Sequence, residues 1–281
     1  MSAKSKTYGI FCTKGGVGKT TQGANLGAIL ADMGQRVLLI DADPQQSMSR
    51  FFEVIQAAPH GLSQVYRSAS TAECISKTAI TNLDIILNDD KGSEGKIPNF
   101  LRESVLHFQH LRHALEQLSE YDYIFIDTQG ASGIIQESVI MAADVLLSPI
   151  KPQILDSREF IHGTIELVNK FKPKPGFHSI TGRPMPPVKV LINLWDRTTT
   201  ATEVSNHLRC TFDKETDGHV TVLNTVIPTL KAYSEAAGLG IPAHRHEPSR
   251  EGPTRSALDT LLELVYELEP KLYGIKPQWN A

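Results

Sequence analysis

Cysteine is scarce and unpatterned in this 281-residue sequence, which has three cysteines far apart and no C-x-x-C pair. An odd number of unclustered cysteines argues against a disulfide framework and predicts reduced thiols in a cytoplasm. No apolar run reaches the length of a membrane span, and the N-terminal segment lacks the apolar stretch of a signal peptide. The formal net charge is −3, so any binding of nucleic acid must come from a local surface.

Short apolar runs alternate with helical stretches along most of the chain. Continuous apolar runs, which are typical of parallel strands covered on both faces, occupy residues 8–12, 37–41, 123–127, 145–147, 188–192 and 220–227. Helices are predicted over residues 20–33, 107–118, 157–171, 201–212 and 254–268. The pattern predicts an α/β fold: one doubly wound domain over residues 1–281, with its core at about 8–268 and a mainly parallel sheet with helices on both faces.

Two segments and one residue type are predicted to lie on the surface. Residues 172–187 hold five prolines, and both this segment and residues 88–96 are predicted to be exposed loops. The ten histidines, including the H-R-H run at 244–246, are not at metal-binding spacing and are predicted to be surface residues.

A phosphate-binding loop is predicted directly after the first strand, where residues 13–21 read T-K-G-G-V-G-K-T-T. The end matches G-x-x-x-x-G-K-[ST], although Thr13 stands where that pattern has a glycine. Strand, loop and helix come in the required order, so loop N–H groups and the helix dipole favour phosphate. Lys19 is predicted to lie along the β- and γ-phosphates, and the Thr20 hydroxyl to ligate Mg²⁺.

Lys14 is the unusual residue of the loop. The signature K-G-G-x-G-K-[ST], complete at residues 14–20, resembles that of the ParA/MinD family of deviant Walker A ATPases. The resemblance runs from about residue 10 to about residue 268. It implies that Lys14 reaches across a dimer interface to the partner's ATP, so the dimer is stable mainly with ATP bound. A unit charge pair near 4 Å is worth about 4 kcal/mol at an effective dielectric of 20, before desolvation. The nucleotide-binding residues of the loop are then Lys14, Gly15, Gly16, Val17, Gly18, Lys19, Thr20 and Thr21.

Three aspartates end or follow apolar runs. Residues 41–45, D-A-D-P-Q, resemble the family's D-x-D-P-Q switch segment, which implies that Asp43 positions the attacking water and Asp41 helps to hold the Mg²⁺ shell. Helix capping is the other role open to both. Asp127 corresponds to the Walker B acid, which contacts Mg²⁺ through water. The family usually continues with a proline pair, whereas this chain has Thr128-Gln129-Gly130, so the resemblance does not fix the conformation there.

Nucleobase and DNA contacts rest on shorter likenesses. Asn193 and Pro228 match positions where relatives hold the adenine, and Arg197 and Lys231 match positions of DNA-contacting cations. Other cations could widen the DNA-binding patch or could simply be solvated: Lys170, Lys172, Lys174, Arg245, Arg250 and Arg255.

The resemblance implies a cytoplasmic, nucleoid-associated ATPase of the ParA (Soj-like) type, with ATP and Mg²⁺ as cofactors. It would form an ATP-dependent homodimer, bind double-stranded DNA nonspecifically and partition or position a plasmid, chromosome or mobile element. A ParB-like partner would stimulate hydrolysis. Little chain precedes the first strand, so no N-terminal helix-turn-helix domain is expected, and the acidic C-terminal region argues against membrane binding. The alternatives are an ATPase that positions a protein cargo on the nucleoid and an ATP-dependent ligase of the dethiobiotin-synthetase kind.

Overall fold

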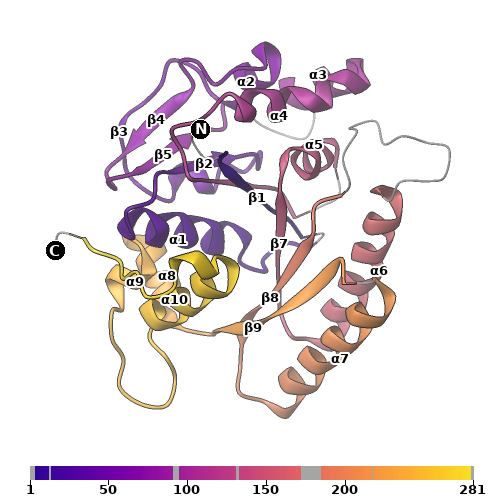
Figure 1. The fold of residues 1–281 in the computed structure, drawn as a ribbon, viewed down its shortest axis with the longest axis vertical. Coiled ribbons are helices and arrows are strands. Elements are labelled where there is room, and N and C mark those ends of the chain that lie inside the picture. Colours follow the sequence, from indigo (N-terminus) through magenta and orange to yellow (C-terminus); the bar gives the residue numbers. More distant parts are fainter. Residues whose placement is uncertain are drawn as a thin grey trace.

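The described part of the chain forms one nine-stranded sheet. The computed structural model describes residues 4–12, 14–90, 95–130, 133–171, 185–216 and 218–279. The strand order is β3-β4-β5-β2-β6-β1-β7-β8-β9 (Figure 1). The strands are β1 (Lys6–Ile10), β2 (Val37–Asp41), β3 (Val54–Gln56), β4 (Ile75–Thr78), β5 (Leu83–Ile86), β6 (Tyr123–Asp127), β7 (Val145–Ile150), β8 (Val188–Trp195) and β9 (Val220–Pro228). All neighbouring strands are parallel except β3/β4 and β4/β5.

Helices connect the strands. The α-helices are α1 (Lys19–Asp32), α2 (Leu62–Ser68), α3 (Lys96–Glu103), α4 (His110–Glu116), α5 (Ile134–Ala142), α6 (Ile154–Phe171), α7 (Thr199–Glu215), α8 (Lys231–Leu239), α9 (Ala243–His246) and α10 (Ala257–Leu268). Short 3₁₀ turns occupy Met48–Arg50, Val105–Gln109 and Pro270–Leu272. The predicted doubly wound, mainly parallel α/β fold is confirmed.

Both faces of the sheet are covered, which explains the continuous apolar runs. Successive side chains of a strand point to opposite faces. In β2, Val37 and Leu39 join the cluster under α1 and α8–α10, whereas Leu38 and Ile40 join the cluster under α2–α5. A third cluster lies between β7–β8 and helices α6 and α7 (Figure 1). The loops at the carboxyl ends of the central strands therefore stand on a rigid core.

Two of the surface predictions are wrong in part. Within residues 88–96, Asn88 and Asp90 are buried, because the Asp90 carboxylate accepts backbone N–H groups of Lys96 and Ile97 at 2.8 and 2.7 Å and so caps α3. His244 is fully buried beside Asp32 instead of lying on the surface. Of the other predicted loop, residues 172–184 lie outside the described residues. In the part of the chain that the structure describes, no helix is long and apolar enough to cross a membrane.

Candidate functional site

The glycine-rich loop lies at the carboxyl end of β1, in the middle of the sheet, and leads into α1. Gly16 and Gly18 have φ values of 69° and 88°, a left-handed conformation that glycine adopts at no steric cost. No side chain caps the N-terminus of α1, so its first N–H groups are available to an anion. Lys19 is buried, and its ammonium donates to the carbonyl oxygen of Lys14 at 3.2 Å. The loop thus combines backbone donors with a cation held inside it.

Asp127 lies beside Thr20, as expected for a shared metal ion. The Thr20 hydroxyl donates to Asp127 Oδ2 at 2.5 Å, while Asp127 Oδ1 is buried without a hydrogen-bond partner. Burial raises the pKa of Asp127 to about 8, and the nearby charge of Asp41 raises it further, whereas Thr20 and Lys19 act in the opposite direction. A buried carboxylate whose pKa is raised, and which has an oxygen without a hydrogen-bond partner, has too little positive charge nearby to compensate its own negative charge. A cation placed here would supply it.

Asp41 organises the segment that carries Asp43. Its two carboxylate oxygens accept backbone N–H groups of Asp43 at 3.0 Å and Ser49 at 2.7 Å. Burial raises the pKa of Asp41, although these hydrogen bonds oppose the change. Asp43 is half-buried, and the Asn88 amide donates to its carbonyl oxygen at 3.1 Å. The sequence alone gave no sign of Ser49 and Asn88, since both contacts depend on how distant segments fold together.

Asn193 supports the loop from the end of β8. It is buried, its amide nitrogen donates to the carbonyl oxygen of Val17 at 2.7 Å, and its oxygen accepts from Gln22 at 3.1 Å. A Cβ on Gly18 would lie 2.2 Å from Asn193 Nδ2, so this contact requires glycine. Pro228 ends β9 and pairs in register with Trp195. Contact of Asn193 and Pro228 with adenine stays a prediction.

Comparison with known proteins decides the family. A family profile described as "AAA domain" matches residues 5–174. The sporulation initiation inhibitor protein Soj of Bacillus subtilis (strain 168) is 31% identical over 256 residues, 88% of this chain and 93% of Soj. The chain belongs to the ParA/MinD family of deviant Walker A ATPases.

One further relative of this ParA/MinD-type ATPase agrees with that assignment, and one solved structure shares its fold. The chromosome partitioning protein ParA of Caulobacter vibrioides (strain NA1000 / CB15N) is 31% identical over 238 residues, 82% of each chain. A solved ATP complex of a Cyanothece McdA variant is 24% identical, with a TM-score of 0.76 over 99% of this chain and 100% of that one, and so shares its fold. The predicted resemblance and the predicted ATPase class are confirmed.

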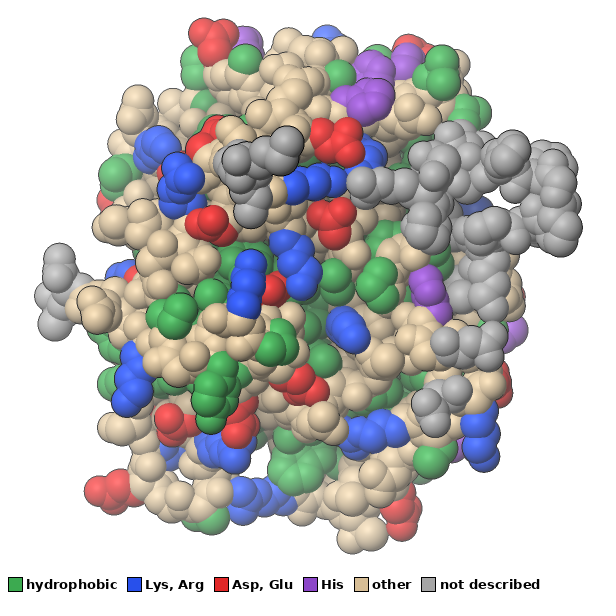
Figure 2. Space-filling model, in the orientation of Figure 1, with side chains coloured by type: hydrophobic (Ala, Val, Ile, Leu, Met, Phe, Trp, Pro, Cys, Tyr) green, Lys and Arg blue, Asp and Glu red, His purple; other side chains and the backbone are tan. Residues whose placement is uncertain are grey.

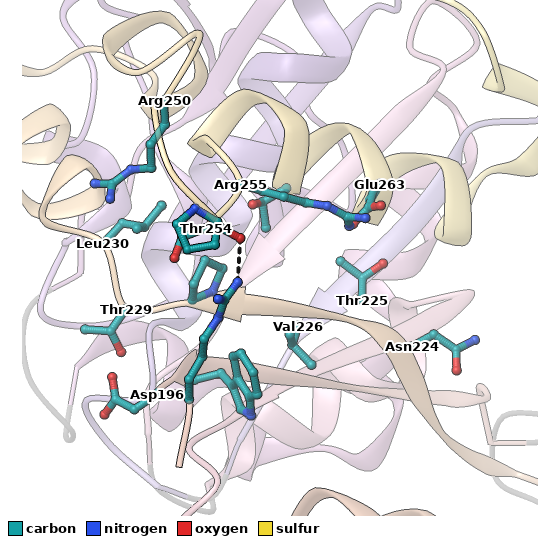
Figure 3. A pocket seen from close by; sticks show the side chains of 15 residues that line it. Asp196, Asn224, Thr225, Val226, Thr229, Leu230, Arg250, Thr254, Arg255 and Glu263 are labelled. Atoms are coloured by element: carbon teal, nitrogen blue, oxygen red, sulfur yellow. Dashed lines mark hydrogen bonds and ion pairs between the residues drawn. The ribbon is translucent and has the colours of Figure 1, made fainter. Parts of the chain in front are cut away.

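The predicted DNA-contacting cations of the ATPase lie beyond the carboxyl ends of two adjacent strands. Arg197 comes just after β8 and Lys231 just after β9, and both side chains are exposed. Neither pairs with a carboxylate within the described ranges; the Arg197 guanidinium donates to the carbonyl oxygen of Pro253 at 2.5 Å. Arg197 also lines an open pocket of about 540 Å³ together with Arg250 and Arg255 (Figure 3).

Those of the other candidate cations that lie in the described ranges are bound to acids. Arg255 pairs with Glu263 in the lining of the pocket (Figure 3), and Arg250 pairs with Glu247 at 2.9 Å. Lys170 pairs with Glu137 at 2.6 Å. Arg245 binds both carboxylate oxygens of Asp32 and so serves the core rather than the patch. Lys172 and Lys174 lie outside the described residues.

Proposed function

We propose that this chain is a DNA-partitioning ATPase of the ParA type, which dimerises on ATP and binds DNA nonspecifically as a dimer. A cargo-bound, ParB-like partner stimulates hydrolysis and releases it, so that the protein works on the cytoplasmic nucleoid. The observation that carries the proposal is the complete deviant loop, with Lys14 five residues before Lys19, on the same edge of the sheet as Arg197 and Lys231.

The residues at the loop fit Mg²⁺. Thr20 and Asp127 would hold the ion, Asp127 through water, and Asp41 would add charge behind them. Among the described residues, no three His, Cys, Asp or Glu side chains form a ready metal site. That agrees with Mg²⁺, which keeps several waters and binds through one or two carboxylates plus substrate phosphates. When bound, the ion neutralises charge that develops on the phosphates.

The chain's own residues supply the rest of the site. Lys19 and the uncapped N–H groups of α1 bind the β- and γ-phosphates, and Lys14 adds charge to the partner's nucleotide. Asp43 positions the attacking water. Phosphoryl transfer needs chiefly such positioning and charge, because the protein takes little part in covalent chemistry.

DNA binding follows from dimerisation. One copy of Arg197 and Lys231 engages few phosphates, whereas a dimer presents two copies together. Each phosphate contact releases counterions, so affinity falls steeply with salt. The similarity to the chromosome partitioning protein of Caulobacter vibrioides supports a partitioning role.

The test is binding to two duplexes of unrelated sequence with ATP and Mg²⁺ or with ADP, over a series of salt concentrations. We expect equal affinity for both duplexes with ATP and much weaker binding with ADP. Arg197→Glu and Lys231→Glu should weaken binding to both duplexes, and each lost phosphate contact should reduce the log–log salt slope by about 0.9. ATP-dependent dimerisation should not change.

The matched control is Arg102→Glu, which makes the same charge change at an exposed site on α3, in the other half of the molecule. It should bind DNA like wild type. A protein that dimerises on ATP but ignores DNA at low salt would contradict the proposal in favour of protein positioning. Hydrolysis that requires a small carboxylate or amine would favour the ligase instead.

A further inference from the structure

The segment after β6 touches the part of the loop that carries Lys14. Gly130 is half-buried, three residues beyond Asp127. A Cβ on Gly130 would lie 2.7 Å from Gly15 Cα, 2.8 Å from Gly15 N and 3.1 Å from the carbonyl carbon of Lys14. The first two distances are far below van der Waals contact, and the atoms are backbone atoms that cannot rotate away. Only a residue without a side chain allows this approach.

The Lys14–Gly15 peptide is held from two sides. Lys19 donates to the Lys14 carbonyl oxygen, and Gly130 lies against the same peptide. On its other side the loop is open, since a Cβ on Gly15 would meet nothing within 4 Å. The Lys19 ammonium can give up this hydrogen bond to a bound phosphate, whereas the contact between Gly130 and the Lys14–Gly15 peptide joins backbone atoms and depends on no side chain.

The position of Gly130 is itself fixed by the central strands. The buried hydroxyl of Thr128 donates to the carbonyl oxygen of Ile10 at 2.7 Å, and Asp127 pairs in register with Ile10. The chain between Asp127 and Gly130 is therefore anchored to the end of β1. Through Gly130, the strand end that carries Asp127 touches the backbone of Lys14.

We infer that Gly130 is a positioning residue for Lys14, setting the direction in which this lysine leaves the loop toward the partner's nucleotide. The inference rests on the proposed ATP-dependent dimer. Gly130 lies in Thr128-Gln129-Gly130, the segment in which this chain departs from the family's usual proline pair. The inferred role is therefore specific to this chain's variant of the segment.

The test is Gly130→Ala in the full chain, with ATP binding and dimerisation measured separately. The added methyl group must displace the Lys14–Gly15 peptide. We expect the affinity of the monomer for ATP to stay within about 3-fold of wild type, while the dimer weakens and kcat falls by about 10-fold or more, because the overpacked backbone must shift. A merely structural glycine would change both affinities or neither.

Gly133→Ala is the matched control in the same segment. A Cβ there would meet only the end of the Gln129 side chain, at 2.7 Å, which can rotate aside. We expect it to bind ATP, dimerise and hydrolyse like wild type.

The outcomes separate this role from the proposed function. Wild type that stays monomeric with ATP would overturn both. Wild type and Gly130→Ala that dimerise alike would overturn the role of Gly130 alone, as would loss of ATP binding in a folded Gly130→Ala. If that variant does not fold, hydrogen exchange on wild type decides: ATP should protect residues 14–18 and 128–130 together, and protection of 14–18 alone would overturn the role.

Discussion

Lys14 and Lys19 lie in one loop but have different surroundings, so replacing each of them should remove a different activity. Lys19 is buried inside the loop, whereas Lys14 is half-buried at its rim. Lys19→Ala removes charge from the chain's own phosphate site, so we expect it to lose ATP binding. Lys14→Ala should keep monomeric ATP binding but lose ATP-dependent dimerisation and hydrolysis. Sedimentation with ATP and Mg²⁺, beside nucleotide titrations, measures both. A normal dimer of Lys14→Ala would reduce Lys14 to an ordinary loop cation.

Asp127 should make the nucleotide-free protein less stable than a variant with a neutral side chain at this position. Its pKa is raised to about 8 by burial, so the folded state binds the proton more tightly than the unfolded state. Stability from this group is therefore present at low pH and is lost as the pH rises from the unfolded pKa of about 4 to about 8. Asp127→Asn keeps the shape without the charge. We expect it to raise the melting temperature and to abolish Mg²⁺-dependent hydrolysis.

Thermal unfolding in EDTA between pH 5 and 9 measures this effect. The gain from Asp127→Asn should grow up to about pH 8 and level off above it, because the slope ends at the folded pKa. Thr20→Val, which removes only the hydroxyl that opposes the raised pKa, should not stabilise the protein. A gain that is the same at every pH would contradict the charge argument.

Sequence reasoning singles out residues that belong to a local motif and misses residues that act through distant contacts. Thr20 and Asp127 were predicted to share one ion, and they lie hydrogen-bonded to each other. The sequence predicts His244 on the surface, because no neighbouring residue indicates that it pairs with the buried Asp32. In the sequence, Gly130 stands out only as a departure from a family pattern.

At the scale of elements, α1 is anchored at its C-terminal end. Its N-terminus faces the phosphate site, and Asp32 at its C-terminus binds His244 at 2.7 Å and Arg245 through two hydrogen bonds. Burial alone would raise the pKa of Asp32, but the hydrogen bonds from these two residues outweigh it and lower the pKa. The backbone N–H of Gln278 donates to the Asp32 carbonyl oxygen at 2.7 Å. The C-terminal segment and α9 thus fix the helix that begins at the nucleotide site.

This anchor should weaken in acid through His244. Burial lowers the pKa of His244, although Asp32 opposes the change, and its Nδ1 has no partner among the described residues. The unfolded chain therefore takes up this proton first, and stability falls as the pH drops below about 6.5 toward the lower folded pKa. His244→Gln keeps a donor for Asp32 without titrating. We expect the free energy of unfolding of wild type to fall more steeply between pH 7 and 5 than that of the variant.

Urea unfolding at several pH values measures that difference, at most about 1.4 kcal/mol per pH unit for one proton. The His60→Gln variant is the control, since His60 is exposed. It should leave the steepness unchanged. Parallel curves for wild type and His244→Gln would contradict the role of this histidine.

The long apolar strands were predictable and the short ones were not. The runs at 37–41 and 123–127 coincide with β2 and β6, because five buried residues in succession leave few alternatives. The antiparallel strands β3 and β4 have only three and four residues, and part of each is exposed. Their apolar pattern is too short to predict a strand from the sequence. The helix predicted over 107–118 begins instead as a 3₁₀ turn, and α4 starts at His110. These errors lie away from the nucleotide site, where motif and periodicity agree.

At the scale of the whole molecule, charge gives no general attraction to DNA. Basic and acidic side chains are interspersed on the face shown in Figure 2, in agreement with the net charge of −3. Under the proposed function, DNA binding therefore depends on bringing two copies of a small surface together, and release depends on separating them. The state of the nucleotide would then control the cycle through the dimer.

Blocking hydrolysis should trap the molecule on DNA. Asp43→Ala removes the carboxylate that is proposed to position water, while the loop, Thr20 and Asp127 stay in place. The variant loses one hydrogen bond, from the Gln45 N–H to Asp43 Oδ1 at 2.9 Å, which costs about 1 kcal/mol and leaves the fold intact. We expect it to bind ATP, dimerise and bind DNA, but to hydrolyse very slowly. After ATP is removed, wild type should leave DNA at its rate of hydrolysis, and Asp43→Ala should remain bound far longer. Ser47→Ala, at an exposed site four residues on, should behave like wild type. If Asp43→Ala leaves DNA as fast as wild type, hydrolysis does not control release, and the link from nucleotide to dimer to DNA breaks at that step.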